Sequence, residues 1–298
     1  MIIDFCAYLG NWPLYPLPIR DAARLIRAMD RCGIGAAFVS LVDGAFSLNP
    51  QEANERIGAL VAEQSGRLLP VGTVDPTSPC WREDVAEGVE HLGLAGFRIH
   101  PTYQGYTLDN EEVLALADTL ALARRPLFIA AFIDEERFQH PAFQVPPVPL
   151  DQIANLIRHA PETTIVLNNL TVEQAAVLLD LPGGALNNVF MDVNAMGKPF
   201  NGLAQLIQHH GSDRLVYGSQ VPFLYPEAAL ALLHESTTLL DRGHPARSSG
   251  HDHPARPNPQ PTGEATEAIL EQNWRASETL RDLVESVPSK QAHYLAAL

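Results

Sequence analysis

Short apolar stretches alternate along the chain with longer segments of helical period. Eight of the stretches are rich in Val, Ile and Phe and have the length of buried strands, which is typical of repeated strand and helix units around a parallel sheet. They lie near residues 2–8, 36–42, 68–74, 96–100, 127–132, 164–168, 189–193 and 215–218. Eight such units predict the α/β class and a single (β/α)8 TIM barrel spanning residues 1–298, with an extra C-terminal helix. In such a barrel the chemistry lies where the strands end.

Helix boundaries between these strands are predicted from capping residues. Side-chain oxygens before a helix can accept from its unpaired N–H groups, glycine suits the left-handed residue after it, and Thr171 with Gln174 has the spacing of a capping box. The expected N-terminal caps are Asn49, Ser78, Asp109 and Thr171, and the expected C-terminal glycines are Gly33 and Gly66.

Two segments interrupt the alternation. Residues 133–149 form a long loop with Pro and Phe after the fifth strand, which predicts a lid over the functional face. Residues 242–263 are rich in Pro, Gly, Ser and His and predict a flexible insert on the opposite face. The insert holds His251-Asp252-His253, but without a strand to fix the two rings we do not interpret it as a metal site.

Composition narrows the classes of partner. The 298 residues carry a formal charge of −15, and no clustered cations are present to bind nucleic acid. Three unpatterned cysteines and an N-terminus without a signal peptide predict a cytoplasmic protein, and no apolar run is long enough to predict a membrane span.

Several short motifs resemble one known family. Residues 96–101 read Gly-Phe-Arg-Ile-His-Pro, residues 105–109 continue that motif, residues 217–222 read Tyr-Gly-Ser-Gln-Val-Pro, and residues 273–275 read Asn-Trp-Arg. In chain order these are similar to the fourth-strand, eighth-strand and last-helix motifs of the amidohydrolase-related (amidohydrolase 2) family of metal-dependent hydrolases and decarboxylases. The resemblance implies a barrel with a metal at its mouth.

The positions at which this family holds its metal carry other residues here. The resemblance places the first-strand His-x-His clamp at Cys6 and Tyr8, two further histidines at Ala130 and Asn169, and the eighth-strand aspartate at Gln220. Alanine offers no donor, and neutral amides and a phenol are poor ligands for zinc. Gln220 cannot act as a general base. We therefore expect a degenerate site without metal or other cofactor.

A rebuilt site is predicted from side chains that alternate into the barrel. Asp4, Cys6 and Tyr8 are expected on one face of the first strand, as are Arg98 and His100 on the fourth. A buried Arg98 needs an anionic partner, which Asp4, Asp192 or a bound carboxylate could supply. His100 is the candidate for acid/base catalysis, although bracing the following loop is an equally available role.

Other polar residues are expected around Arg98 at the mouth of the barrel. They are Tyr8, Tyr103, Tyr106, Asn169, Asp192 and Ser219, with His140 on the long loop. These groups suffice to hold a small anion, and they could equally satisfy one another in space that the metal has left.

Three hypotheses follow for function. The first is a small-molecule (carboxylate) binding protein or pseudoenzyme without metal. The second is a metal-independent hydrolase or lyase acting on a small carboxylated substrate, with Arg98 as anion anchor and His100 as proton carrier. The third is a metal-dependent hydrolase with a site rebuilt from Cys6, His100, Asp192 or His140. Hydrolase activity is thus left open, and the resemblance also leaves a homodimer open.

Overall fold

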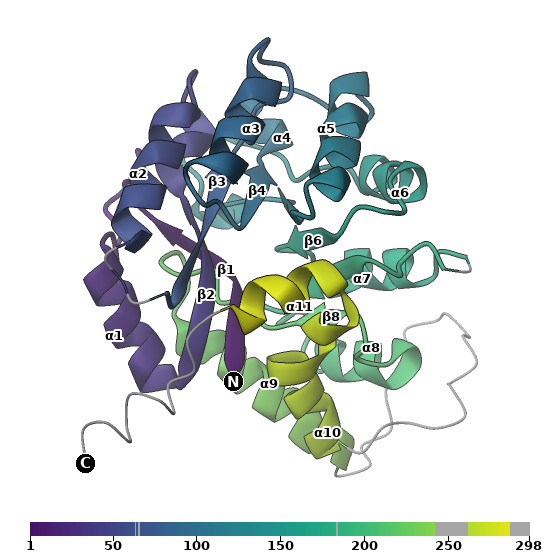
Figure 1. Ribbon diagram of the computed structural model, residues 1–298. Coiled ribbons are helices and arrows are strands. Elements are labelled where there is room, and N and C mark those ends of the chain that lie inside the picture. Colours follow the sequence, from purple (N-terminus) through teal and green to yellow (C-terminus); the bar gives the residue numbers. More distant parts are fainter. Residues whose placement is uncertain (63, 65, 183, 242–261, 287–298) are drawn as a thin grey trace.

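The computed structural model describes residues 1–62, 64, 66–182, 184–241 and 262–286. Eight parallel strands form one sheet in which each strand pairs with the next along the chain (Figure 1). The strands are β1 (Ile2–Leu9), β2 (Ile34–Leu41), β3 (Leu68–Thr73), β4 (Gly96–Ile99), β5 (Leu127–Ala130), β6 (Ile165–Asn168), β7 (Val189–Asp192) and β8 (Leu215–Val216). All eight predicted strands are present, most of them one or two residues shorter at the C-terminal end.

The sheet closes between its first and last strands. The Phe5 amide donates to the Tyr217 carbonyl at 2.9 Å, and the Tyr8 amide donates to the Val221 carbonyl at 2.8 Å. A parallel bridge also joins Ala7 to Val221. The predicted (β/α)8 TIM barrel is therefore confirmed.

Helices surround the barrel and bury an apolar stripe against the outer faces of the strands (Figure 1). They are α1 (Ala22–Cys32), α2 (Gln51–Ala62), α3 (Trp81–Glu90), α4 (Pro101–Gln104), α5 (Glu111–Leu122), α6 (Leu150–His159), α7 (Val172–Leu179), α8 (Gly202–His210), α9 (Pro226–Asp241), α10 (Thr262–Glu267) and α11 (Glu278–Glu285). Shorter turns are η1 (Val42–Phe46), η2 (Glu136–Phe138), η3 (Ala268–Gln272) and η4 (Asn273–Ala276).

The capping predictions hold in part. Thr171 forms both bonds of the capping box with Gln174, and Gly33 ends α1 with a φ of 68°. Two N-terminal caps were placed wrongly. The side chain of Asn110, not Asp109, accepts from the Glu112 amide at the start of α5. Ser78 stands in a turn before α3, which begins at Trp81 without a side-chain cap.

The expected cap at Asn49 is present as a single weak hydrogen bond. The expected C-terminal glycine, Gly66, lies several residues past the end of its helix. Asn49 Oδ1 accepts from the Gln51 amide at 3.3 Å. Gly66 has a φ of 73° but lies beyond the end of α2 at Ala62. Local capping chemistry thus located these boundaries to within a few residues.

The half of the barrel interior nearer the N-terminal ends of the strands, here called the lower half, is filled by apolar side chains. Phe5 stacks on Phe38 there, with 5.0 Å between the ring centroids, and the tilted Phe128 ring follows at 5.3 Å from Phe38. Trp274 of η4 and Leu280 of α11 belong to the same buried cluster, so the C-terminal helix covers the N-terminal ends of the strands (Figure 1). The polar residues of the interior are therefore confined to the upper half.

An irregularity in β1 changes which of its residues face the interior. Phe5 belongs to the lower interior cluster and Tyr8 to the upper one, whereas Ala7 packs outward against the helices. The pairing with β2 shifts between Asp4 and Ala7, which resets the alternation. The expectation that Asp4 shares a face with Cys6 and Tyr8 was therefore wrong, because it assumed a regular strand.

Only one of the two interrupting segments lies wholly within the described residues. Residues 133–149 include η2 and line a cavity at the mouth of the barrel. Their role as a lid stays a prediction. The predicted insert at 242–263 lies outside the described residues apart from its last two positions, which begin α10. His251-Asp252-His253 also lies outside them. Among the described helices, none combines the length and the apolar character that a membrane crossing requires.

Candidate functional site

The residues at the expected metal positions gather at the upper end of the barrel. Asn169 and Gln220 stand just past β6 and β8 in left-handed backbone, with φ values of 67° and 55°. The Asn169 Nδ2 donates to the Phe132 carbonyl at 2.6 Å, and the Gln220 Nε2 donates to the Ile133 carbonyl at 2.6 Å. Both amides thus fasten the start of the loop after β5. Left-handed backbone is uncommon for glutamine and persists where the surrounding structure enforces it.

Cys6 is a neutral thiol in this arrangement. Its side chain is fully buried and donates to the Asn169 Oδ1, with 3.7 Å between the sulfur and the oxygen. Burial raises the pKa of the thiol well above its usual value, and the Asp192 carboxylate raises it further. Since the thiolate is the form that attacks carbon or binds metal, Cys6 is suited to neither role as it stands.

The donor set does not fit a catalytic metal. Ala130 contributes only a methyl group, and the side-chain N–H groups of Asn169 and Gln220 are committed to backbone carbonyls. Within the described residues, no three His, Cys, Asp or Glu side chains come together as a metal site. A zinc or similar ion needs several thiolate, imidazole or carboxylate ligands. We therefore derive no chemistry through a metal.

Asp192 is the centre of a buried hydrogen-bond network. Its carboxylate accepts from Asn168 Nδ2 at 2.7 Å, from the Asn169 amide at 3.2 Å and from Asn194 Nδ2 at 2.7 Å. Gly218 makes room for this side chain, because a Cβ there would come within 2.7 Å of the Asp192 Cβ. The network therefore joins the upper ends of β6 and β7, and Gly218 beyond β8 packs against it.

Asp4 forms a second buried carboxylate network beside the first. It accepts from the Cys6 amide at 3.0 Å and from the Ser219 amide and hydroxyl at 2.9 and 2.5 Å. Ser219 was expected to face a ligand, but its hydroxyl is used in holding β1 to the segment after β8. Burial raises the pKa of both Asp4 and Asp192 to about 6, against the opposing effect of these donors.

The raised pKa values predict that Asp4 and Asp192 contribute more to stability after mild acidification. Both groups bind protons more readily in the folded chain, so their contribution to stability is complete below about pH 4 and is lost as the pH rises through about 6. In a His100→Gln variant, lowering the pH from 7 to 5.5 should therefore raise the free energy of unfolding by about 1 to 2 kcal/mol in urea titrations. In the wild-type protein His100, whose pKa is lowered by burial to about 3, offsets most of this gain, because the histidine binds a proton in the unfolded chain and not in the folded one. A free energy of the variant that is constant or falls over this interval would contradict the pKa shifts of Asp4 and Asp192.

Arg98 is a fully buried cation in the upper half of the barrel. Its guanidinium lies 4.5 Å from the centroid of the Tyr8 ring and 5.2 Å from that of Phe128. It donates weakly to the carbonyls of Ala7 at 3.3 Å and Phe5 at 3.4 Å, and its Nε has no partner among the described residues.

None of the ion pairs among the described residues involves Arg98. Neither Asp4 nor Asp192, the two expected partners, therefore neutralises this cation by direct contact. A buried cation without a carboxylate partner is uncommon, since removing it from water costs several kcal/mol. The remaining expectation, a bound anion, stays open.

Two more polar side chains beside Arg98 lack partners. The Tyr8 hydroxyl and both ring nitrogens of His100 are buried without a hydrogen bond to any described residue. The two rings are neighbours, with centroids 6.4 Å apart. Burial and the charge of Arg98 lower the pKa of His100 to about 3, so at pH 7 the ring is neutral and is not the imidazolium that a general acid requires. Buried polar atoms of this kind are normally bonded to water or a ligand.

The other predicted site residues lie elsewhere. The Tyr103 hydroxyl accepts from the Asp134 amide at 3.3 Å and so braces the loop after β5. Tyr106 is buried among the outer core residues, where its hydroxyl contacts Gln104 at 3.3 Å. His140 is exposed on the long loop, and its Nδ1 accepts from the Ala142 amide. The structure therefore does not place Tyr106 and His140 with Arg98.

A cavity of about 450 Å³ opens at the mouth of the barrel. Residues from the loop after β5 form much of its wall, together with Tyr15, Gln220 and Phe223. Phe223 also packs edge-on against Tyr8, with 6.0 Å between the ring centroids, and so separates this cavity from the Tyr8, Arg98 and His100 group. Asp134 was missed in the sequence because no motif marks it, and the only available signal was the length of the loop on which it lies.

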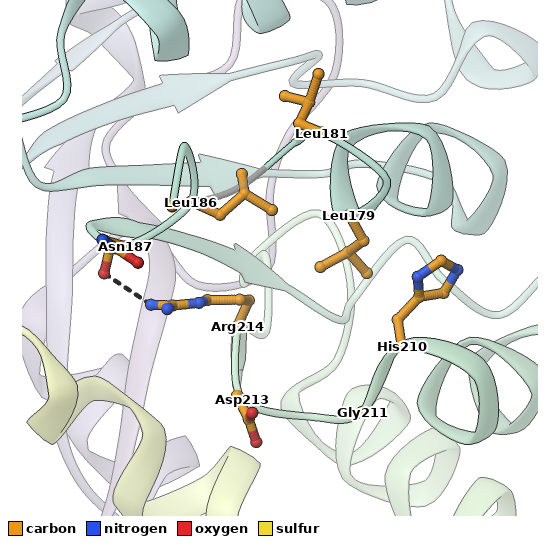
Figure 2. A pocket seen from close by; sticks show the side chains of 9 residues that line it. Leu179, Leu181, Leu186, Asn187, His210, Gly211, Asp213 and Arg214 are labelled. Atoms are coloured by element: carbon orange, nitrogen blue, oxygen red, sulfur yellow. Dashed lines mark hydrogen bonds between the residues drawn. The ribbon is translucent and has the colours of Figure 1, made fainter. Parts of the chain in front are cut away.

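A smaller cavity, of about 190 Å³, lies toward the opposite end of the strands. Figure 2 shows Leu179, Leu181 and Leu186 on one part of its wall and Arg214 on another. Arg214 donates to the Asn187 carbonyl at 2.7 Å, which ties together the two turns that precede β7 and β8. Chemistry in (β/α)8 barrels lies at the other face, so we assign this cavity no catalytic role.

The family assignment rests on a match to the family model described as amidohydrolase, which covers residues 35–273. The chain belongs to the amidohydrolase family. The match begins after β1, so the segment with Cys6 and Tyr8 lies outside it. No curated protein matches the sequence.

Solved structures show the same fold as this amidohydrolase barrel at low sequence identity. A 2,6-dihydroxybenzoate decarboxylase from Rhizobium is 12% identical, with a TM-score of 0.64 over 94% of this chain and 98% of that one. A 5-carboxyvanillate decarboxylase from Sphingomonas paucimobilis is 13% identical, with a TM-score of 0.66 over 94% and 98%. An uncharacterised TIM-barrel protein from Bordetella bronchiseptica is 14% identical, with a TM-score of 0.63 over 95% and 99%.

Proposed function

We propose that this amidohydrolase barrel is a pseudoenzyme that binds a small carboxylate without a metal. The observation that carries the proposal is the buried Arg98 cation, which has no carboxylate partner among the described residues and an unpartnered Nε. A ligand carboxylate bound there would neutralise the guanidinium and could accept hydrogen bonds from it. The Tyr8 hydroxyl and the His100 ring would gain the partners that they lack.

The ligand would enter through the cavity at the mouth. Phe223 lines that cavity and contacts Tyr8, so a rotation of its side chain would connect the cavity with the Arg98 group. Two of the solved structures with this fold are decarboxylases named for aromatic carboxylates. Such compounds are therefore suitable first probes.

The two enzymatic hypotheses have less support. A metal-independent hydrolase or lyase would use His100 as proton carrier, but a pKa of about 3 leaves its ring unprotonated near neutral pH. A rebuilt metal site would draw on Cys6, His100, Asp192 or His140, but no three His, Cys, Asp or Glu side chains of the described residues come together as a metal site. His140 itself lies exposed on the loop.

Thermal unfolding with a matched pair of ligands tests the proposal. We expect 2,6-dihydroxybenzoate at saturating concentration to raise the midpoint by about 5 °C and its neutral amide to leave it unchanged, since about 3 kcal/mol of ligand stabilisation is typical at a hundredfold excess over Kd. The bound compound should be recovered unchanged by chromatography. Decarboxylated product would favour the enzymatic hypothesis, and equal shifts with acid and amide would contradict an anion site at Arg98.

A further inference from the structure

The wall of the mouth cavity carries more carboxylates than cations. Among its lining residues are four carboxylates, at Asp134, Glu135, Glu136 and Glu173, and only two cations, at Arg137 and Lys198. Much of the remaining wall is apolar, including Tyr15, Phe132, Ile133, Phe138, Val145 and Phe223. The cavity thus combines negative charge with room for an organic body.

The two cations of the wall are already paired with one glutamate. Glu135 binds Arg137 at 2.8 Å through one carboxylate oxygen and Lys198 at 2.9 Å through the other. Glu136 and Glu173 lie exposed at the rim, where water and salt screen their charges. Asp134 is consequently the carboxylate of this cavity with neither a cation beside it nor free access to solvent.

Asp134 lines the cavity, and hydrogen bonds fix both of its backbone groups. Its amide donates to the Tyr103 hydroxyl at 3.3 Å, and its carbonyl accepts from Gln139 Nε2 at 2.8 Å. Gln139 is itself fixed by two bonds to the backbone of Val145, at 2.7 and 3.1 Å. The Asp134 residue is 3% exposed, and its Oδ2 has no hydrogen-bond partner among the described residues.

We propose that the mouth cavity binds a primary or secondary ammonium group on an aromatic or aliphatic body, with Asp134 as its counter-ion. An ammonium would supply the missing hydrogen-bond donor to Oδ2, and the adjacent Tyr15 and Phe223 rings suit a cation on an apolar body. A bare metal ion fits less well, because the described residues hold no group of three ligating side chains. The charge of −15 on the chain also attracts cations.

This inference stands on the cavity alone and does not depend on Arg98. Burial raises the pKa of Asp134, while a contact with the Tyr15 hydroxyl lowers it. A bound ammonium would favour the ionised carboxylate further. If both Arg98 and Asp134 bind ligand groups, the natural ligand carries an acid and an amine.

Calorimetric titration of phenethylamine and of 2-phenylethanol tests the inference. The two probes differ in the ammonium alone, so we expect the wild-type protein to bind the amine at least about tenfold more tightly than the alcohol. In Asp134→Asn the advantage of the amine should disappear. Glu136→Gln removes the same unit of charge from the exposed rim and should change the affinity for the amine less than about twofold.

Each other outcome overturns the inference. Failure of the wild-type protein to bind the amine, or equal affinity for amine and alcohol, would contradict an ammonium site even if no variant folded. Equal losses in Asp134→Asn and Glu136→Gln would show that general charge, not Asp134, attracts the amine. Arg98→Met should leave the affinity for phenethylamine unchanged, whereas carboxylate binding depends on Arg98, so the two proposals can fail separately.

Discussion

Replacing Asp192 by alanine is expected to lower the free energy of unfolding by about 3 to 5 kcal/mol, which is typical when one member of a buried charged network is removed. The change would remove the acceptor for Asn168 Nδ2, the Asn169 amide and Asn194 Nδ2. The Asn169 amide and Asn194 Nδ2 would then be left without a partner, and Asn168 Nδ2 would keep only its bond to the Phe5 carbonyl at 3.3 Å.

Urea unfolding followed by circular dichroism measures this loss. Asp118→Ala is the matched control, because Asp118 is exposed on α5 and makes no ion pair in the described residues, and it should change stability by less than about 0.5 kcal/mol. A loss at Asp192 no larger than the loss at Asp118 would show that the network does not hold the upper ends of the strands together.

Replacing Arg98 by methionine is expected to abolish carboxylate binding while leaving the free protein as stable as before, or more stable by about 1 to 2 kcal/mol. The gain would come from removing a buried cation that has no carboxylate partner, because well-packed apolar residues often replace buried charges without cost. Methionine can occupy much of the space between Tyr8 and Phe128. A residue kept for binding at the expense of stability behaves in this way.

Parallel measurements of stability and binding on Arg98→Met distinguish an anion site from an internal brace. If Arg98 serves only to fill the space of a lost metal, the variant should be destabilised, because it loses the weak bonds to Phe5 and Ala7 and the contacts with the two rings. Arg125→Met is a useful control, since Arg125 donates to the Leu94 carbonyl outside the site and should not affect ligand binding. Destabilisation of Arg98→Met together with unaltered carboxylate binding would refute the proposed anchor.

The fold could be predicted from the sequence because hydrophobic periodicity and chain order determine it strongly. Buried parallel strands appear as short apolar runs, and all eight lay where the pattern placed them. The capping box at Thr171 was equally visible, since both of its bonds form between residues three apart. Asn110 shows the limit of such signals: two adjacent residues could cap α5, and only the backbone geometry decides between them.

The site could be predicted only where its residues follow strand alternation or a family motif. Alternation placed Arg98 in the interior and the resemblance to the amidohydrolase-related family located the metal positions, whereas the shift in β1 turned Asp4 away from Cys6 and Tyr8. A bulge leaves no clear mark in a run of apolar residues. Asp134 was missed for a different reason, because a carboxylate on a loop looks solvated until the fold buries it among residues distant in sequence.

Metal content of the purified protein tests most directly whether this barrel functions without an ion. The protein should be prepared without added metal, incubated with excess zinc or manganese, passed through a desalting column and examined by elemental analysis. The neutral donor set at Ala130, Asn169 and Gln220 leads us to expect less than about 0.1 equivalent of any transition metal, since these side chains are poor ligands. About one equivalent of retained metal, lost on Cys6→Ala, would contradict the metal-free site.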